Sequence, residues 1–231
     1  PTRRSSDLHG HSFGLSYHTD RLYRSMRLLG IRPVTAPDEF TEIVEVIVEE
    51  SEIEEGYVKI IVTRGSDDHN FTIPARSALQ PNVLVYGKPI DLNAIEKVQS
   101  GVNCITLDDD RGHHCDILSL NQLNNMMARA EAQKKNCYDA VFIKDGLLTE
   151  ASHSNVCIVK AGVIWTPATN EHMIRGVTRS LVLTRAAPSA GVTSIDEASE
   201  PVRFEDMMTA EEVFLTNSQD GIIPVLSIDG N

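Results

Sequence analysis

Apolar residues repeat at helical spacing in the first fifty residues. One set recurs every three or four positions between residues 17 and 30, and a second set begins after Pro37. The two faces consist of Leu22, Met26 and Leu29, and of Phe40, Ile43 and Ile47. This spacing predicts two amphipathic helices that cover a sheet.

The sheet is predicted by two runs rich in Val and Ile, Tyr57 to Thr63 and Asn82 to Tyr86, which glycines flank. Together with the helices they make a small α/β domain. The stretch from Gly87 to Asn93 contains a glycine and a proline and few apolar residues, which is typical of a linker. We therefore place a domain boundary near residue 88, with a small domain at 9–88 and a large domain at 89–231. Residues 1–8 show no periodic pattern, and we interpret them as an N-terminal segment foreign to the domain and leave them out of the fold prediction.

The large domain is predicted to be rich in short strands. Val102 to Leu107 is typical of a strand, and Ser119 to Lys134 of a helix with an apolar side. That side is formed by Leu120, Leu123, Met127 and Ala130. The apolar segments that follow, separated by turns, are 140–143, 155–159, 163–165, 212–216 and 222–228, with helices near 178–187 and 204–210. This pattern favours a compact sheet or pseudo-barrel.

Charge and composition argue against some classes of binding partner. The 231 residues include 21 basic and 33 acidic ones, a net charge of -12, which would repel nucleic acid and anionic membranes. No apolar run approaches the roughly 20 residues that span a bilayer, and no secretory signal is visible, so we expect a cytoplasmic protein. The four cysteines lack the spacing of a zinc site or of a small disulfide scaffold and are interpreted as buried thiols.

Three motifs carry the chemistry: Cys115 to Asn121 (CDILSLN), Leu148 to Asn155 (LTEASHSN) and Ile174 to Arg179 (IRGVTR). In order and spacing they resemble the active site of the class IV (fold type IV) aminotransferases, the family of D-amino-acid and branched-chain aminotransferases. The resemblance runs from about Phe13 to the C-terminus. It implies pyridoxal 5'-phosphate (PLP) as cofactor, an amino acid and a 2-oxo acid as substrates, and a homodimer. It also implies a small α/β domain beside a larger pseudo-barrel domain, in a chain that we expect to be truncated at both ends.

The sequence Gly176-Val177-Thr178 precedes an apolar helix, so backbone N–H groups and the Thr178 hydroxyl could converge on an anion. Taken by themselves, these residues fit an ordinary helix cap better. The resemblance reverses that preference, because the family holds the cofactor phosphate at this turn. It assigns Val177 and Thr178 to the phosphate.

The resemblance assigns further roles. Arg21, in His18-Thr19-Asp20-Arg21-Leu22, would bind the phosphate through its guanidinium, and Ser218 would add a hydroxyl. Glu150 would keep the pyridine nitrogen of the cofactor protonated, which makes the ring a better electron sink. Ile174 would pack on the ring. His69, in the loop from Thr63 to Phe71, is a weak candidate for the substrate carboxylate, and a plain polar turn is the stronger interpretation.

Leu118 occupies the position at which the family carries its catalytic lysine. That lysine binds the cofactor covalently and carries a proton, and leucine has no group for either task. If the register is right, amino-group transfer should fall by several orders of magnitude. Two alternatives remain open: a lyase of the aminodeoxychorismate type, which needs the same lysine, and a non-catalytic PLP-binding protein.

Two polar clusters invite a metal interpretation, which we reject. The run His113-His114-Cys115-Asp116 is interpreted as strand, in which neighbouring side chains point to opposite faces and cannot meet at one ion. Asp108-Asp109-Asp110 is interpreted as a solvated turn. We therefore predict no metal site.

Overall fold

The computed structural model describes residues 2–8, 11–51, 53, 55–66, 79–194 and 201–231. The chain forms two compact units. Unit 1 consists of Pro1–Asp91 and Ile117–Leu120, and unit 2 of Leu92–Asp116 and Asn121–Asn231. None of the helices in the described part of the chain has the length and apolarity that a bilayer crossing requires.

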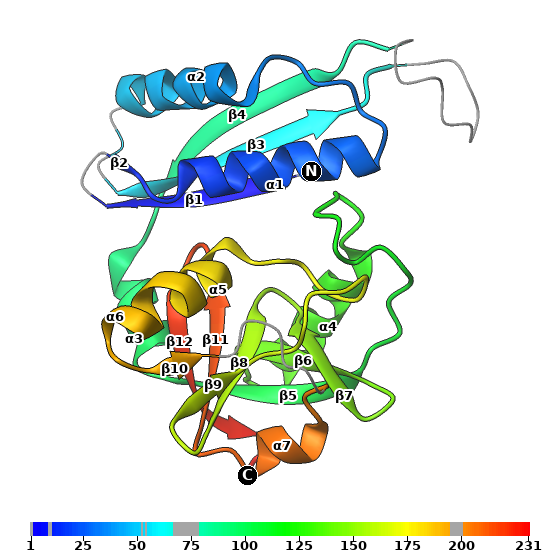
Figure 1. The fold of residues 1–231 in the computed structure, drawn as a ribbon, viewed down its shortest axis with the longest axis vertical. Coiled ribbons are helices and arrows are strands. Elements are labelled where there is room, and N and C mark those ends of the chain that lie inside the picture. The colour runs from blue at the N-terminus through cyan, green and yellow to red at the C-terminus, as the bar shows by residue number, and fades with distance from the viewer. Residues whose placement is uncertain (1, 9–10, 52, 54, 67–78, 195–200) are drawn as a thin grey trace. The chain divides into compact units, whose positions relative to one another are not determined.

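Unit 1 is a four-stranded antiparallel sheet in the order β2-β1-β3-β4, with two helices beside it (Figure 1). The elements are β1 (Thr2–Leu8), β2 (His11–Ser12), α1 (Leu15–Leu28), α2 (Pro37–Glu50), β3 (Gly56–Thr63) and β4 (Asn82–Pro89). Residues 1–8, which the sequence analysis left out of the fold, contain β1, and Thr2–Ser6 of this strand pair with β3. A strand paired through backbone hydrogen bonds needs no apolar alternation of its own.

The buried face of α1 agrees with its spacing, whereas the buried face of α2 is shifted by one residue after Phe40. Leu22 and Met26 of α1 and Phe40 of α2 are buried, but Ile43 is exposed and its neighbour Val44 is fully buried instead. Alternate residues of β3 complete this core, as expected for a sheet covered on one face.

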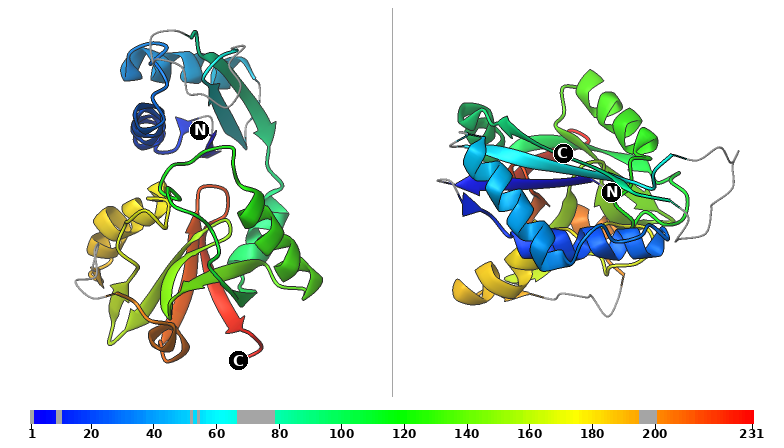
Figure 2. Two further views of the ribbon diagram at one scale, coloured as in Figure 1. Left: turned by 90° about the vertical axis from the view of Figure 1, so that its right-hand side faces the viewer. Right: turned by 90° about the horizontal axis from the view of Figure 1, so that it is seen from above.

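Unit 2 is built on an eight-stranded sheet in the order β10-β9-β8-β11-β12-β5-β6-β7, which curls into a half-barrel (Figures 1 and 2). Its strands are β5 (Val102–Asp108), β6 (Asp139–Lys144), β7 (Leu147–Ala151), β8 (Asn155–Lys160), β9 (Val163–Trp165), β10 (Thr193–Ser194), β11 (Glu212–Asn217) and β12 (Gly221–Ile228). Its helices are α3 (Leu92–Gln99), α4 (Leu123–Lys134), α5 (Val177–Leu181), the π-helix η1 (Val182–Ala186), α6 (Ala187–Ser189) and α7 (Phe204–Met208). The segments α5, η1 and α6 follow one another without a break.

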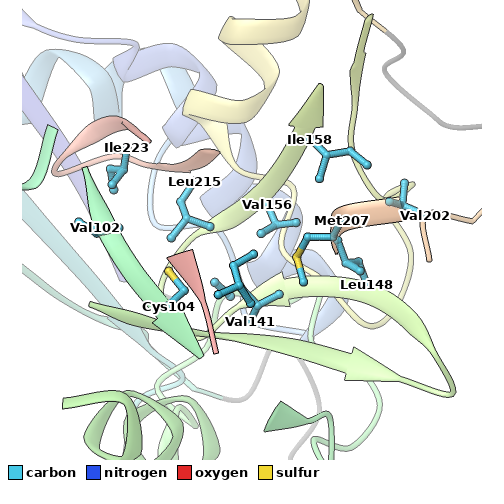
Figure 3. Close-up of a cluster of buried hydrophobic side chains, with 12 residues drawn as sticks. Val102, Cys104, Val141, Leu148, Val156, Ile158, Val202, Met207, Leu215 and Ile223 are labelled. Carbon is cyan, nitrogen blue, oxygen red and sulfur yellow. The ribbon is translucent and has the colours of Figure 1, made fainter. Parts of the chain in front are cut away.

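The concave side of this sheet encloses the main apolar core (Figure 3). Val141 of β6, Val156 of β8 and Leu215 of β11 are completely buried there and come from strands far apart in the sequence. Burial of apolar side chains is the dominant favourable term in folding, so this core holds β6, β8 and β11 in place. The polar ends of these strands carry the candidate site.

The helix after the first motif differs from the prediction. It begins at Leu123 and not at Ser119, and Leu123 and Met127 are 64% and 62% exposed. The buried face is made by Ala128 and Ala132, which pack against β5 and β6 with Phe142. The small alanine side chains allow a close approach of helix and sheet, whereas the larger apolar side chains point away from it.

Candidate functional site

Glu150 lies on β7 with its side chain buried. One carboxylate oxygen, Oε1, accepts a hydrogen bond from Arg111 Nη1 at 2.5 Å. The other, Oε2, accepts from the backbone N–H of Ile174 at 2.9 Å and from Asn155 Nδ2 at 3.4 Å. Three elements therefore fix the orientation of this carboxylate.

Arg111 is a site residue that the sequence analysis did not identify. It is buried, and its Nε and Nη2 atoms each donate to one oxygen of Asp109 at 2.8 Å. The guanidinium lies 4.3 Å from the centre of the Phe142 ring, and Nη2 also donates to the carbonyl of His172. The interpretation of Asp109 as part of a solvated turn is wrong, because its carboxylate is buried in this ion pair. The sequence signal that could have indicated this ion pair is the spacing of Asp109 and Arg111, two opposite charges at positions i and i+2 after a strand.

The ionisation of these groups follows from burial and pairing. Burial raises the pKa of Glu150 to about 7, although Arg111 and the Ile174 N–H oppose the increase. Burial also pushes the pKa of Asp109 upward, but its bonds to Arg111 outweigh that effect and leave the pKa below its ordinary value. Arg111 stays protonated, since its bonds to Asp109 and the charge of Glu150 raise its pKa despite burial. The Arg111 cation thus stabilises the charged forms of both Asp109 and Glu150.

The polar residues that follow Glu150 form a second buried group. Asp139, at the start of β6, accepts hydrogen bonds from the hydroxyls of Ser152 at 2.5 Å and Ser154 at 3.2 Å. Burial raises the pKa of Asp139, against the lowering by Ser152. The amide of Asn155 donates to the carbonyl of Ile174 at 2.8 Å. These bonds explain why the motif is a run of small polar residues.

The predicted phosphate turn is the start of α5. Val177 is buried and Thr178 is half-buried, and the Thr178 hydroxyl donates to the carbonyl of Asn217 at 2.9 Å. A Cβ atom at Gly176 would overlap Asn155 Oδ1, so any larger residue here requires the Asn155 side chain to move. Ser218 is half-buried in the turn after β11.

Thr216 is an unpredicted member of this region. It is directly opposite Asn155 in the β8–β11 pair, so the two side chains lie on the same face of the sheet. Its hydroxyl is buried and has no hydrogen-bond partner in the described part of the chain. A buried hydroxyl without a partner is costly, and an acceptor from a bound ligand would satisfy it.

The remaining candidate residues belong to unit 1 or fall outside the described residues. Arg21 is half-buried on α1, with Nη2 3.4 Å from His18 Nδ1. Leu118 is half-buried and lies in the segment Ile117–Leu120, outside any helix or strand. His69 lies outside the residues that the structure describes. Of the predicted residues, unit 2 contains Glu150, Ile174, Val177, Thr178 and Ser218.

The strand expected at His113-His114-Cys115 is not formed. These residues lie in turns and irregular backbone, and His114 has a positive φ of 68°. The strand alternation on which the metal interpretation was rejected therefore does not apply here. His113 and His172 instead flank the exposed Glu171 carboxylate at 3.5 and 3.7 Å.

The residues of unit 2 fit a ligand that carries both a phosphate and a basic ring nitrogen. Glu150 offers a buried carboxylate that a protonated ring nitrogen would neutralise. The turn at Gly176 and the partnerless Thr216 hydroxyl offer donors for an anion. PLP has both groups, so the donor set suits it.

Comparisons with known proteins identify the family. The model of the amino-transferase class IV family matches residues 4–228. The D-alanine aminotransferase of Bacillus licheniformis is 35% identical over 218 residues, which are 94% of this chain and 75% of the relative. The chain therefore belongs to the class IV aminotransferases, as the motifs predict. The members of this family are enzymes that depend on PLP.

Solved structures share the fold. A fold IV-transaminase from Curtobacterium pusillum has a TM-score of 0.85 at 22% identity, covering 100% of this chain and 79% of its own. A putative 4-amino-4-deoxychorismate lyase from Legionella pneumophila gives 0.85 at 20% identity, with 99% and 82% covered. The branched-chain amino acid aminotransferase of Escherichia coli gives 0.83 at 20%, with 99% and 76% covered. The predicted fold class, a fold type IV α/β protein with a larger β-rich half-barrel, is confirmed.

Proposed function

We propose that this chain binds PLP in the site of unit 2, and that the site is built for amino-group transfer between an amino acid and a 2-oxo acid. The observation that carries the proposal is the buried carboxylate of Glu150, fixed by Arg111 and by the Ile174 N–H in the same unit as the Gly176–Thr178 turn. A D-amino acid is the proposed donor, because a D-alanine aminotransferase is the 35% identical relative. A branched-chain donor has only the likeness in fold behind it.

Bound PLP supplies an electron sink that stabilises negative charge at the substrate α-carbon. Glu150 would hold a proton at the ring nitrogen, and Arg111 keeps the Glu150 carboxylate in place. The N–H groups of Val177 and Thr178 and the Ser218 hydroxyl would hold the phosphate, and Ile174 would contact the ring. The family resemblance adds the Arg21 guanidinium as a further phosphate ligand. His69 is the proposed contact for the substrate carboxylate. A homodimer in the cytoplasm is proposed on the same family grounds.

Leu118 sets the expected rate. Its side chain has no amine, so no group at this position binds the cofactor covalently or moves the proton from the α-carbon. We therefore propose that the native chain holds cofactor but turns over several orders of magnitude more slowly than a chain with lysine at this position. The alternative of a non-catalytic PLP-binding protein rests on the same residue. A lyase of the aminodeoxychorismate type would need the same missing amine.

The experiment compares the native chain with Leu118→Lys and with Leu118→Met, which has a similar volume and no amine. Each protein is mixed with PLP, its visible spectrum is recorded, and transfer from D-alanine to a 2-oxo acid is assayed. We expect a new absorption band and transfer only for Leu118→Lys. Cofactor binding by Leu118→Lys without transfer from any amino acid would favour a binding role. Failure of all three proteins to bind PLP would refute the site.

A further inference from the structure

Asn217, the last residue of β11, is a buried polar hub that the roles proposed so far do not use. Its Nδ2 atom donates to Tyr138 Oη, Ser154 Oγ and Asp220 Oδ2, each at 3.2 Å. Its Oδ1 atom accepts from the backbone N–H groups of Gln219 at 2.9 Å and Asp220 at 2.7 Å. All the polar atoms of this side chain are therefore engaged.

The bonds to Oδ1 shape the turn that carries Ser218. A side-chain oxygen that accepts from the N–H groups two and three residues later replaces a backbone turn bond and fixes the intervening residues. Ser218 is the first residue inside this turn, which ends where Gly221 pairs with Asn217. The Asn217 side chain thus fixes the backbone that carries Ser218.

The backbone of the same residue holds the start of α5. The Thr178 hydroxyl donates to the Asn217 carbonyl at 2.9 Å. Because the side-chain bonds of Asn217 hold this residue in place, its carbonyl is a fixed acceptor for Thr178. The first turn of α5 is therefore linked to the end of β11. Two of the groups proposed to bind the phosphate, Thr178 and Ser218, are therefore positioned by one asparagine.

The hub is anchored in the rest of unit 2. Ser154, which accepts from Asn217, donates to the buried carboxylate of Asp139 at 3.2 Å. Asp220 accepts from Tyr138 Oη at 2.6 Å, and its carbonyl accepts from Gln99 Nε2 at 2.9 Å. Buried networks of satisfied polar groups stiffen the backbone that they join.

We infer that Asn217 is a positioning residue for phosphate recognition, which holds Thr178 and Ser218 in register without contacting the ligand itself. The inference rests on the proposed function, because it needs a phosphate at this turn. It implies that loss of the Asn217 side chain weakens binding of the phosphate and leaves binding of the ring unchanged. A merely structural asparagine would weaken both.

The test uses the full chain and two probes that differ only in the phosphate, pyridoxamine 5'-phosphate and pyridoxamine. Neither needs an amine at position 118. Dissociation constants are measured by calorimetry for the native chain, Asn217→Ala and Asn217→Ser. Serine can accept from the same turn N–H groups, so it should keep part of the effect. Val141→Ala is the control, because it removes buried apolar volume without removing a side chain that makes hydrogen bonds.

We expect the native chain to prefer the phosphorylated probe, and Asn217→Ala to lose about tenfold of that preference, the equivalent of one hydrogen bond. Asn217→Ser should fall between them, and Val141→Ala should keep the native preference. An unchanged preference in Asn217→Ala, or an equal loss for both probes, would overturn the role of Asn217 alone. No preference in the native chain would overturn the phosphate site and this role together. Should Asn217→Ala not fold, the preference of Asn217→Ser decides.

Discussion

Arg111 and Glu150 form a buried ion pair, with 2.5 Å between Nη1 and Oε1, although 39 residues separate them in the sequence. The same guanidinium binds both oxygens of Asp109. One positive charge therefore stands between two carboxylates in the interior of unit 2. Such an arrangement depends strongly on the cation, because each carboxylate has lost its water.

Arg111→Met should destabilise the chain by about 3–5 kcal/mol, because it leaves Asp109 and Glu150 buried without their cation. Urea denaturation measures the change in the free energy of unfolding. Lys134→Met is the matched control, since it breaks an exposed pair with Glu131 and should change the free energy of unfolding far less. An equal, small effect of both substitutions would contradict the structural weight given to Arg111.

Glu150 should make the unfolding free energy fall as pH rises through the range from about 4.5 to about 7. Its pKa is about 7 in the folded chain against an ordinary 4.5, so between these values the folded state holds a proton that the unfolded state releases. The expected loss is about 3 kcal/mol over this range, with no further change from this residue below or above it.

The measurement compares denaturation of the native chain and of Glu150→Gln across pH 4 to 8. Asp139 also has a raised pKa and contributes a change of the same sign, but it does so in both proteins. The difference between the two curves therefore isolates Glu150. Parallel curves would show that the pKa of Glu150 is not raised.

Gly176→Ala should cost about 1–3 kcal/mol, because the added methyl group overlaps Asn155 Oδ1. The φ of Gly176 is -65°, which any residue adopts, so the cost comes from the overlap and not from the backbone. Displacement of Asn155 would also break its bond to the Ile174 carbonyl. Gly112→Ala is the control, because its methyl group would meet no atom within 4 Å. Additive losses in the double variant Gly176→Ala/Asn155→Ala would argue against this overlap.

Thr216→Val should leave the stability of the ligand-free chain unchanged or raise it by up to about 1 kcal/mol, because it removes a buried hydroxyl that makes no hydrogen bond. Thr166→Val should instead cost about 1–3 kcal/mol, since the Thr166 hydroxyl donates to the Val156 carbonyl at 2.8 Å. Thermal unfolding with and without pyridoxamine 5'-phosphate adds a second readout. Stabilisation by the ligand should be smaller in Thr216→Val than in the native chain, and equal stabilisation would exclude Thr216 from the site.

The strands and the motif residues could be predicted because local pattern determines them. The apolar runs that become β3 and β8 are continuous in the sequence, and the small polar run after Glu150 is a recognisable motif. The partners of those residues could not be predicted in the same way. Arg111, which follows β5, meets Glu150 of β7, and Asn217 at the end of β11 meets Thr178 at the start of α5, only through tertiary packing.

Helical spacing alone predicted the wrong buried face for one helix. The residues 119–134 have two sides that could be buried, one with large apolar side chains and one with alanines. The alanine side packs against the sheet, because the side chains of Phe142 and Ile105 already fill most of the space between the helix and the sheet. Which side of a helix is buried depends on the shape of its neighbour, and that shape is not encoded in the helix.

The π-helix Val182–Ala186, directly after α5, bears on how this chain aligns with its relatives. A π-turn accommodates one residue more than an α-helical path over the same rise. A relative that is one residue shorter at this point can therefore run as a regular α-helix and still keep its Gly176 equivalent before the helix and its Ala187 equivalent at the other end. A single-residue gap should thus be harmless within 182–186, and disruptive one turn earlier.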